Sequence, residues 1–464
     1  MTLDSNILDQ LHAYGQSNLA EHWQQLAPAQ QATLGEQISQ IDLAEIQRAF
    51  ASKTATGSAE NFDQLEPPPA IRLNDAKPMI SAADAYQAGE ELLTAGKTAS
   101  ILVAGGQGTR LGFDHPKGMF PIGPVSEMTL FQIHFEKLIA RSKRYGVRIP
   151  LYLMTSPATH DETIAYLESQ NYFGLPAEDR HVFCQGTMPA VDHQTGQLLL
   201  SSADSLALSP DGHGGTVAAL ANCGALGTMQ QQGIESIYYF QVDNPLADVC
   251  EPLFLGYHKL SQSQKSTQVI AKQFPEEKLG ILAALDGKVR MVEYSELPTE
   301  LAEATNEQGS LRYWAGNIAV HAFEVEFLQA MVETADSLPW HLAHKKVPYF
   351  DATGNMVSPD QPNAIKFERF IFDLLPSAKN ALVVEVDTAT TFAPVKNATG
   401  AATDTPESVR AAISALHRAW LKQCDVNVSE DVPVEISPLL ALDAEQLKPH
   451  VAKIDEITEP TLFS

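Results

Sequence analysis

A glycine-rich loop carries the strongest chemical signal in the sequence. Residues 105–112 contain four glycines, with Arg110 inside the loop and Lys117 shortly after it. Because glycine has no Cβ, backbone N–H groups in such a loop can come close to a bound phosphate. Arginine offers a planar fork of donors for phosphate oxygens, and lysine offers a compact positive charge. The pattern therefore predicts a site that holds a polyphosphate.

Two common phosphate-binding motifs do not fit this loop. The dinucleotide fingerprint GxGxxG matches Gly106 and Gly108, but Leu111 stands where the third glycine belongs. The P-loop motif needs Ser or Thr directly after its lysine, and Gly118 follows Lys117 instead. Glycines that serve only the turn after a strand are the remaining alternative, although four of them beside two basic residues are unusual for that role.

A carboxylate at the end of a second apolar run is a candidate metal ligand. Asp243 directly follows the apolar run at residues 237–242. In an open α/β sheet, ligands bind outside the carboxyl ends of the strands, so this carboxylate is expected to face the same crevice as the glycine-rich loop. There it can hold Mg²⁺ that bridges phosphate oxygens. The alternative is a turn or cap aspartate before Asn244 and Pro245.

Short apolar runs that alternate with helical patterns must position these groups. Buried strands are expected at residues 101–104, 150–154, 182–184 and 237–242, and helices at residues 130–140 and 159–169. Thr159 and Glu162 predict a capping box for the second helix. Asp286 and Gly287, between two apolar runs, predict an antiparallel hairpin. The fold class is therefore α/β, with a central, mainly parallel but mixed sheet flanked by helices.

Helical spacing also marks both ends of the chain. Residues 5–50 predict several helices, with a capping box at Asp42 and Glu45, and residues 408–422 predict one more. Residues 51–70 are polar and small, which predicts a linker or a strap. We expect an N-terminal helical region with its linker at 1–70, a catalytic domain at 71–400 and a small C-terminal domain at 401–464.

The charge balance excludes several kinds of partner. The chain has 464 residues, and its 31 basic and 57 acidic side chains give a formal net charge of −26. Such a field repels polyanions, so nucleic acid and anionic membrane surfaces are poor candidate partners. No apolar run approaches the ~20 residues of a membrane span, and residues 1–6 lack the basic start of a signal peptide. We therefore expect a cytoplasmic protein.

Cysteines and histidines give little sign of a metal or disulfide framework. The four cysteines are scattered without a CxxC pair. His341 and His344 lie three positions apart, but two histidines without a third ligand make a weak metal site. We expect them to be ordinary helix residues.

Taken together with its further motifs, the sequence resembles the UDP-sugar pyrophosphorylase family, and most closely its eukaryotic-type UDP-N-acetylglucosamine pyrophosphorylases. The family's GGxGTRLG loop, followed by PKG, is present at residues 105–118. Other family motifs occur in the same order, at residues 154–156, 171–175, 185–186, 188–192, 209–212, 242–244, 292–296, 316–318 and 394–398. The resemblance extends from about residue 70 to 440. It implies a Rossmann-like nucleotidyltransferase fold of the GT-A-like type, in a monomer or weak homo-oligomer.

The resemblance implies a reaction in which UTP and a sugar 1-phosphate give a UDP-sugar and pyrophosphate. The attacking oxygen belongs to a phosphate monoester that is mostly dianionic at neutral pH, because its second pKa is about 6. A general base is therefore not needed, and the task is to align two polyanions and neutralise their charge. The resemblance assigns Arg110 and Lys117 to the UTP phosphates, Lys396 to the reacting centre and Asp243 to Mg²⁺.

The resemblance also implies contacts to the base and the sugar. It assigns Val103, Ala104, Gly105, Gly106, Gln185 and Gly212 to the nucleotide. An amide such as Gln185 suits the uracil edge, since it supplies both a donor and an acceptor; the alternative is a buried polar residue at a strand end. Glu293 and Asn317 are assigned to sugar hydroxyls. Phe370 and Phe372 are assigned to the wall of an acyl pocket, although their helical spacing fits plain core residues equally well.

Two departures from the family pattern bear on the sugar. The usual PDGNGG motif reads PDGHGG here, which places His213 where the N-acetylglucosamine enzymes carry a sugar-contacting asparagine. Glucose-specific relatives tend to have histidine in the equivalent turn. The region after residues 436–440 is also shorter than in the eukaryotic enzymes, so a bacterial uridylyltransferase fits both departures. We expect N-acetylglucosamine 1-phosphate as the preferred sugar, with glucose 1-phosphate or a non-catalytic UDP-sugar-binding protein as the alternatives.

Overall fold

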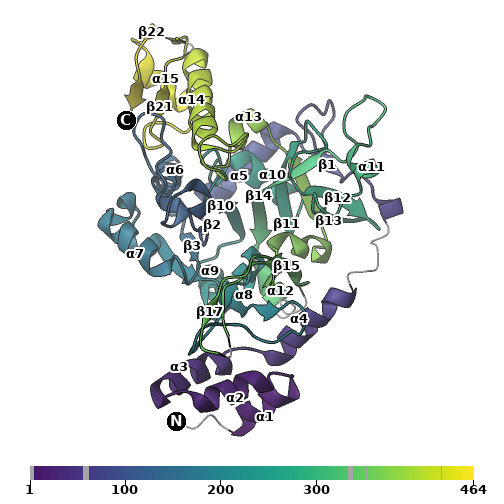
Figure 1. Cartoon of the computed structure of the whole chain (residues 1–464). Coiled ribbons are helices and arrows are strands. Elements are labelled where there is room, and N and C mark those ends of the chain that lie inside the picture. Colours follow the sequence, from purple (N-terminus) through teal and green to yellow (C-terminus); the bar gives the residue numbers. More distant parts are fainter. Residues whose placement is uncertain (1–4, 56–61, 333–337, 352, 430) are drawn as a thin grey trace. The chain divides into compact units, whose positions relative to one another are not determined.

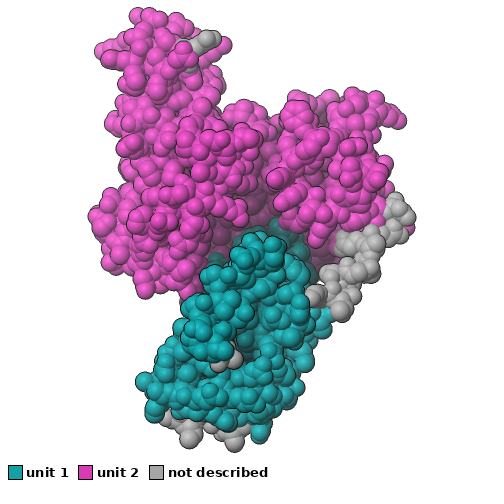
Figure 2. Space-filling view, viewed as in Figure 1, with its two compact units in different colours: residues 1–61, 185–218, 335–373 teal, residues 62–184, 219–334, 374–464 magenta. Residues whose placement is uncertain are grey.

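The computed structural model describes residues 5–55, 62–332, 338–351, 353–429 and 431–464. The chain divides into two compact units. The first comprises residues 1–61, 185–218 and 335–373, and the second comprises residues 62–184, 219–334 and 374–464 (Figure 2). Two internal segments thus join the N-terminal helices in the first unit, a division that no linear reading of composition indicates.

The second unit is built on one large mixed sheet (Figure 1). Its strands run in the order β1-β19-β11-β14-β10-β2-β3-β4, with β12 and β13 attached at β14. The strands are β1 (Ala70–Ile71), β2 (Thr98–Val103), β3 (Leu151–Thr155), β4 (Arg180–Cys184), β10 (Ser236–Gln241), β11 (Lys265–Ala271), β12 (Ile281–Leu285), β13 (Lys288–Val292), β14 (Ala315–Glu324) and β19 (Ala381–Glu385). Every neighbour pair along this order is parallel except those made by β14. The predicted fold class is confirmed.

Helices of the second unit pack with this sheet. They are α5 (Ala82–Thr94), α6 (Leu130–Tyr145), α7 (His160–Ser169), α9 (Ala225–Gln231), α10 (Pro252–Leu260), α11 (Thr299–Ala302), α12 (Val325–Val332) and α13 (Thr388–Thr391). The apolar faces of α5, α6, α7 and α10 join the central strands in one continuous core, which includes the fully buried Leu102, Phe131 and Tyr238. Strand β2 is buried at all six positions, as expected for a central strand of a covered parallel sheet.

The C-terminal elements of the second unit have a hydrophobic cluster of their own. These elements are α14 (Pro406–Gln423), β20 (Asn427–Val428), β21 (Val434–Ile436), α15 (Ala444–Val451), β22 (Glu456–Ile457) and β23 (Thr461–Phe463). Leu421, Val434 and Leu447 lie at the centre of this cluster. In Figure 1 these elements lie together, coloured yellow-green to yellow. The boundaries predicted near residues 70 and 400 stay predictions.

The first unit combines four helices with short strands. Its elements are α1 (Ser5–Ala13), α2 (Ser17–Gln25), α3 (Pro28–Ser39), α4 (Leu43–Ala55), β5 (Thr187–Pro189), β6 (Val191–Asp192), β7 (Leu200–Ser202), β8 (Ser205–Leu206), β9 (Leu208–Pro210), β15 (His341–Lys345), β16 (Tyr349–Phe350), β17 (Met356–Val357) and β18 (Ala364–Glu368). Helix α8 (Thr216–Asn222) begins at the junction with the second unit. Asp42 caps α4, since its carboxylate accepts the Glu45 N–H at 3.0 Å, while the Glu45 carboxylate pairs with Arg369, so one half of the predicted capping box is present. Part of the predicted linker, residues 56–61, lies outside the described residues.

Three local predictions need correction or confirmation. The capping box at Thr159 is wrong, because its hydroxyl bonds Ser156 instead of the first turn of α7. The pair His341 and His344 lies on strand β15 and not on a helix, since this segment pairs with β18 along its whole length. The predicted hairpin is confirmed: Asp286 and Gly287, with φ of 51° and 75°, join β12 to β13.

The helical spacing assigned to residues 366–372 is also wrong. Residues 364–368 form strand β18, and a 3₁₀ helix begins only at Ile371. Among the described residues, no helix combines the length and the apolar composition that crossing a membrane requires.

Candidate active site

The predicted site residues fall into two groups, one on each unit, and each group is described separately. The second unit carries the glycine-rich loop together with Arg110, Lys117, Asp243, Lys396, Glu293 and Asn317. The first unit carries Gln185, Gly212, His213, Phe370 and Phe372.

The glycine-rich loop begins where β2 ends, at Val103. The hydroxyl of Ser156 donates to the carbonyl of Gly105 at 2.7 Å and fixes the start of the loop. A Cβ at Gly108 would lie 2.7 Å from the Phe113 ring, so packing alone requires this glycine. A Cβ at Gly106 would meet no described atom within 4 Å, and its φ is not positive. The fold does not require glycine there, which favours a ligand-binding role for this part of the loop.

The two basic residues of the loop differ in their surroundings. Arg110 lies in a 3₁₀ turn, is exposed and has no ion-pair partner among the residues that the structure describes. Lys117 opens a second 3₁₀ turn, and its backbone N–H donates to the carbonyl of Gly106 at 3.0 Å. Its Nζ lies 3.3 Å from Oδ2 of Asp243, and the two side chains are 16% and 22% exposed.

Asp243 also holds the segment that carries Lys396. Its backbone carbonyl accepts the Val395 N–H at 2.9 Å, so Lys396 follows one position later. The Lys396 N–H donates in turn to the carbonyl of Asp404 at 2.8 Å. Lys117, Asp243, Lys396 and Asp404 therefore lie together beyond the carboxyl ends of β2 and β10, although their segments are far apart in the sequence.

Asp404 is a member of this cluster that the sequence did not identify. Burial raises the pKa of its carboxyl, Lys396 opposes the rise, and Asp243 adds to it. The direction of each effect shows that these charges interact. Its φ of 57° places it in a tight turn directly before α14, where an aspartate is otherwise unremarkable in sequence.

Glu293 and Asn317 come together through Gly280. The Asn317 N–H donates to the Gly280 carbonyl at 2.9 Å, and a Cβ on Gly280 would lie 3.4 Å from the Glu293 carboxylate. Strand β14 bulges directly after Asn317, where Ala319 takes a φ of 56° and donates its N–H to the Asn317 side chain at 3.0 Å. A bulge of this kind redirects a side chain at a sheet edge or a binding site.

In the first unit, His213 is packed by the two predicted phenylalanines. Its ring stacks on Phe370 with centroids 5.2 Å apart and meets the edge of Phe372 at 5.5 Å. The Ile371 N–H donates to Nδ1 of His213 at 3.2 Å. The neutral ring therefore carries its hydrogen on Nε2. Phe372 is buried and Phe370 is half-buried, so Phe370 offers more accessible surface to a ligand.

Asp211 is another residue to which the sequence analysis gave no role, although it belongs to the PDG motif. Its carboxylate is buried, and a Cβ on Gly186 or Gly215 would lie within 2.5 Å of it. Burial raises its pKa to about 6, while Arg369 and the hydrogen-bonding side chain of Gln185 oppose the rise. Gly186 and Gly215 therefore leave space beside Gln185 for a carboxylate whose ionised form is disfavoured by burial. Of these two glycines, only Gly215 lies near the PDG motif in sequence, so the available signal was weak.

His341 is paired with a carboxylate of the same unit. Its Nε2 lies 2.8 Å from Asp373, and its ring packs on Phe370 at 4.3 Å. No group of three or more metal-ligating side chains occurs among the described residues.

Comparison with known proteins identifies the family. Residues 43–454 match the protein family described as UTP–glucose-1-phosphate uridylyltransferase. The chain belongs to this family. The UDP-N-acetylglucosamine pyrophosphorylase of Saccharomyces cerevisiae is 35% identical over 456 residues, which cover 95% of this chain and 96% of the yeast protein. The human UDP-N-acetylhexosamine pyrophosphorylase-like protein 1 is 33% identical, with coverage of 100% and 99%.

Solved structures of uridylyltransferase relatives share the fold. The UDP-N-acetylglucosamine pyrophosphorylase of Trypanosoma brucei, solved with an inhibitor, aligns with a TM-score of 0.85 at 25% identity, over 100% of this chain and 98% of that chain. A structure from Entamoeba histolytica, assigned to the same activity, aligns with a TM-score of 0.78 at 34% identity and covers 86% of this chain and 100% of that one. The predicted family membership is confirmed.

Replacing Lys117 by alanine tests whether the charge cluster serves the reaction. We expect kcat/KM to fall by ~10² to 10³-fold, because one preorganised electrostatic donor is typically worth ~3 to 4 kcal/mol. Steady-state assays of pyrophosphate release measure this change. Lys143→Ala removes an exposed lysine at the end of α6 and serves as the matched control. Near-native turnover in a folded Lys117→Ala protein would contradict the assignment.

Proposed function

We propose that the protein joins UTP and N-acetylglucosamine 1-phosphate to give UDP-N-acetylglucosamine and pyrophosphate. Family membership over residues 43–454, with relatives of that name covering nearly the whole chain, carries this proposal. The cluster of Lys117, Asp243, Lys396 and Asp404 beside the glycine-rich loop supports it. Such a cluster suits the binding of several phosphates at once.

In the proposed mechanism, one oxygen of the sugar phosphate attacks the α-phosphorus of UTP as the bond to pyrophosphate breaks. Lys396 holds the attacking phosphate, while Arg110 and Lys117 hold the phosphates of UTP. The Lys117 ammonium has hydrogens beyond the one that faces Asp243, and these would meet the phosphate oxygens without a large movement. No proton has to move, because the attacking oxygen is already ionised.

A divalent cation is part of this proposal. Magnesium prefers carboxylate oxygens and keeps several waters, so it needs few protein ligands. Asp243 fits this requirement, since its carboxylate is partly exposed and lies among cations that already attract phosphates. Bound there, Mg²⁺ would neutralise charge on the phosphate oxygens. Asp404 is a further carboxylate that interacts with Asp243.

For the first unit, the proposed roles are uracil recognition by Gln185 and the backbone of Gly212, and sugar recognition by His213 with Phe370 beside the acetyl group. For the second unit, the proposed roles are contacts of residues 103–106 to the uracil and ribose, and contacts of Glu293 and Asn317 to sugar hydroxyls. The packing of His213 on Phe370 supports a shared role in sugar choice.

Glucose 1-phosphate is the second candidate substrate, and His213 is the observation that favours it. A protein that binds a UDP-sugar without catalysis would lack some of the basic residues proposed to bind phosphate. Arg110, Lys117 and Lys396 are all present, which disfavours that alternative. We further propose a cytoplasmic enzyme that is a monomer or a weak homo-oligomer.

A panel of substrates tests the proposed function. With UTP and Mg²⁺, N-acetylglucosamine 1-phosphate should be preferred over glucose 1-phosphate by about 5- to 160-fold in kcat/KM, which corresponds to ~1 to 3 kcal/mol in a pocket that merely accommodates an acetyl group. His213→Asn should shift the ratio further toward the acetylated sugar and leave the KM for UTP nearly unchanged. Equal rates with ATP and UTP, or full activity in EDTA, would contradict the proposal. Exclusive use of glucose 1-phosphate by both proteins would contradict the role of His213.

The ionisation of Asp211 should control how well Gln185 reads the base. Above its pKa of about 6 the carboxylate only accepts hydrogen bonds, which holds the amide of Gln185 in one orientation. We expect Asp211→Asn to lower kcat/KM for UTP about 10-fold at pH 7.5. Wild-type Asp211 becomes neutral as the pH falls through 6, so the ratio of wild type to variant should approach one near pH 5.

That ratio cancels the titration of the substrates, whose phosphates ionise in the same range for both proteins. Assays of the two proteins side by side from pH 5 to 8 supply the measurement. A ratio that stays constant across this range would show that Asp211 acts only through packing.

A further inference from the structure

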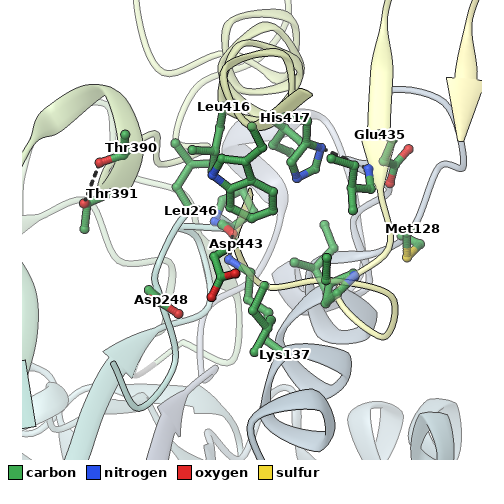
Figure 3. Close-up of a pocket in the computed structure, with 18 of the residues that line it drawn as sticks. Met128, Lys137, Leu246, Asp248, Thr390, Thr391, Leu416, His417, Glu435 and Asp443 are labelled. Atoms are coloured by element: carbon green, nitrogen blue, oxygen red, sulfur yellow. Dashed lines mark hydrogen bonds between the residues drawn. The ribbon is translucent and has the colours of Figure 1, made fainter. Parts of the chain in front are cut away.

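A cavity of about 260 Å³ lies in the second unit, apart from every residue assigned to the reaction. Helices α6 and α14, strand β21 and the segments at residues 245–251 and 438–443 surround it (Figure 3). Its wall is largely apolar and includes Ile133, Leu246, Ile413, Leu416, Trp420 and Ile436. For scale, an apolar cavity of about 150 Å³ holds benzene, so this one has room for a molecule of roughly ten heavy atoms.

Lys137 places a positive charge in the wall of this cavity without a paired carboxylate. Its Nζ donates to the carbonyls of Pro245 at 2.7 Å and Ala247 at 2.9 Å, which uses two of its three hydrogens. It forms no salt bridge with any carboxylate in the part of the chain that the structure describes. Burial lowers its pKa to about 8, an effect that Asp248 opposes and Arg141 reinforces.

The carboxylates of the wall already have partners. Asp248 pairs with Arg141, Asp443 with Arg144 and the Gln446 N–H, Glu435 with the Val125 and Ser126 N–H groups, and Glu251 with Gln268. Each of these carboxylates is engaged by a donor that does not line the cavity, whereas the Lys137 ammonium keeps one hydrogen for a bound molecule. Four nearby negative charges also disfavour a ligand with more than one negative charge.

His417 adds a neutral donor to the same wall. Its Nδ1 accepts the Ile436 N–H at 3.1 Å, so its hydrogen is on Nε2. In Figure 3, the other ring nitrogen of His417 points toward the interior of the cavity. Burial lowers the pKa of His417 to about 3, with Lys137 adding to the effect and the carbonyl of Val434 opposing it. The ring is therefore neutral at physiological pH, and it is only 9% exposed.

We propose that this cavity is a binding site for a small monocarboxylate with an apolar body. Its carboxylate would meet Nζ of Lys137 and Nε2 of His417, which adds a direct ion pair that the ammonium does not make with any carboxylate of the described residues. Its apolar body would pack on Trp420, Leu416 and Ile413. Burying apolar surface supplies binding energy at roughly 25 cal/mol per Å², and the ion pair selects the head group.

The site is separate from the reaction but structurally joined to it. Asn244, next to Asp243, donates from its side chain to the Thr391 carbonyl at 2.8 Å and accepts the Ala393 N–H at 3.1 Å. Thr390 and Thr391 line the cavity. A ligand in the cavity therefore touches the segments that carry Asp243 and Lys396 without taking the place of UTP.

Calorimetric titration of the full chain with 3-phenylpropionate tests the proposal. We expect saturable binding at one site, at least tenfold weaker binding to Lys137→Met, and at least tenfold weaker binding of the neutral analogue 3-phenylpropan-1-ol to the wild-type protein. Lys143→Met, an exposed lysine of the same helix, should bind as wild type does. At pH 8.5 the wild-type protein should take up a fraction of a proton on binding, since a carboxylate raises the pKa of Lys137, and Lys137→Met should take up none.

Leu416→Trp fills the cavity while leaving Lys137 in place, and it should abolish binding in a protein that melts as a folded one. Absence of binding to the wild type, equal binding of the alcohol, or unchanged binding to Lys137→Met would overturn the proposal. Loss of binding in saturating UTP would also overturn it, because the probe would then occupy the nucleotide site.

Discussion

Lys117 and Asp243 meet because β2 and β10 are parallel neighbours in one sheet. Their register sets Val103 opposite Gln241, so the two strands end at the same level of the sheet. Lys117 and Asp243 can therefore meet although they are 126 positions apart in the sequence. The glycine-rich loop then returns to β2, held by the bond from the Lys117 N–H to Gly106. The segment with Lys396 depends on the same strand end, since it attaches to the carbonyl of Asp243. A shift of this register would separate all of these charges.

The charges of the cluster are arranged before any substrate arrives. Two lysines and two aspartates oppose each other within partly buried surroundings, and Arg110 stands outside them without a described ion-pair partner. Fixed charges of this kind need little reorganisation when a polyphosphate binds, which is where much enzymatic rate acceleration originates. This arrangement disfavours the ionised form of Asp404, since burial raises the pKa of its carboxyl.

The parts of this arrangement that depend on continuous apolar runs could be predicted from the sequence. Strands β2, β3 and β10 are buried on both faces, and such strands read as unbroken apolar segments. The helix predicted for His341 and His344 is wrong because a spacing of three suits one face of a helix, and only pairing with the distant strand β18 makes this segment a strand. Asp404 and Asp211 escaped notice because aspartates are ordinary turn residues, and only the folded chain shows that theirs are buried near other charged or polar side chains.

In the proposed reaction, the protein aligns two substrates and neutralises their phosphate charges without forming a covalent intermediate. The stereochemistry at the α-phosphorus is the most direct test of this direct displacement. A single diastereomer of UTPαS is turned over with the sugar 1-phosphate, and the configuration of the resulting thio-UDP-sugar is determined. One in-line displacement predicts inversion of configuration. Retention would require two displacements through a uridylylated side chain, and that result would contradict the account.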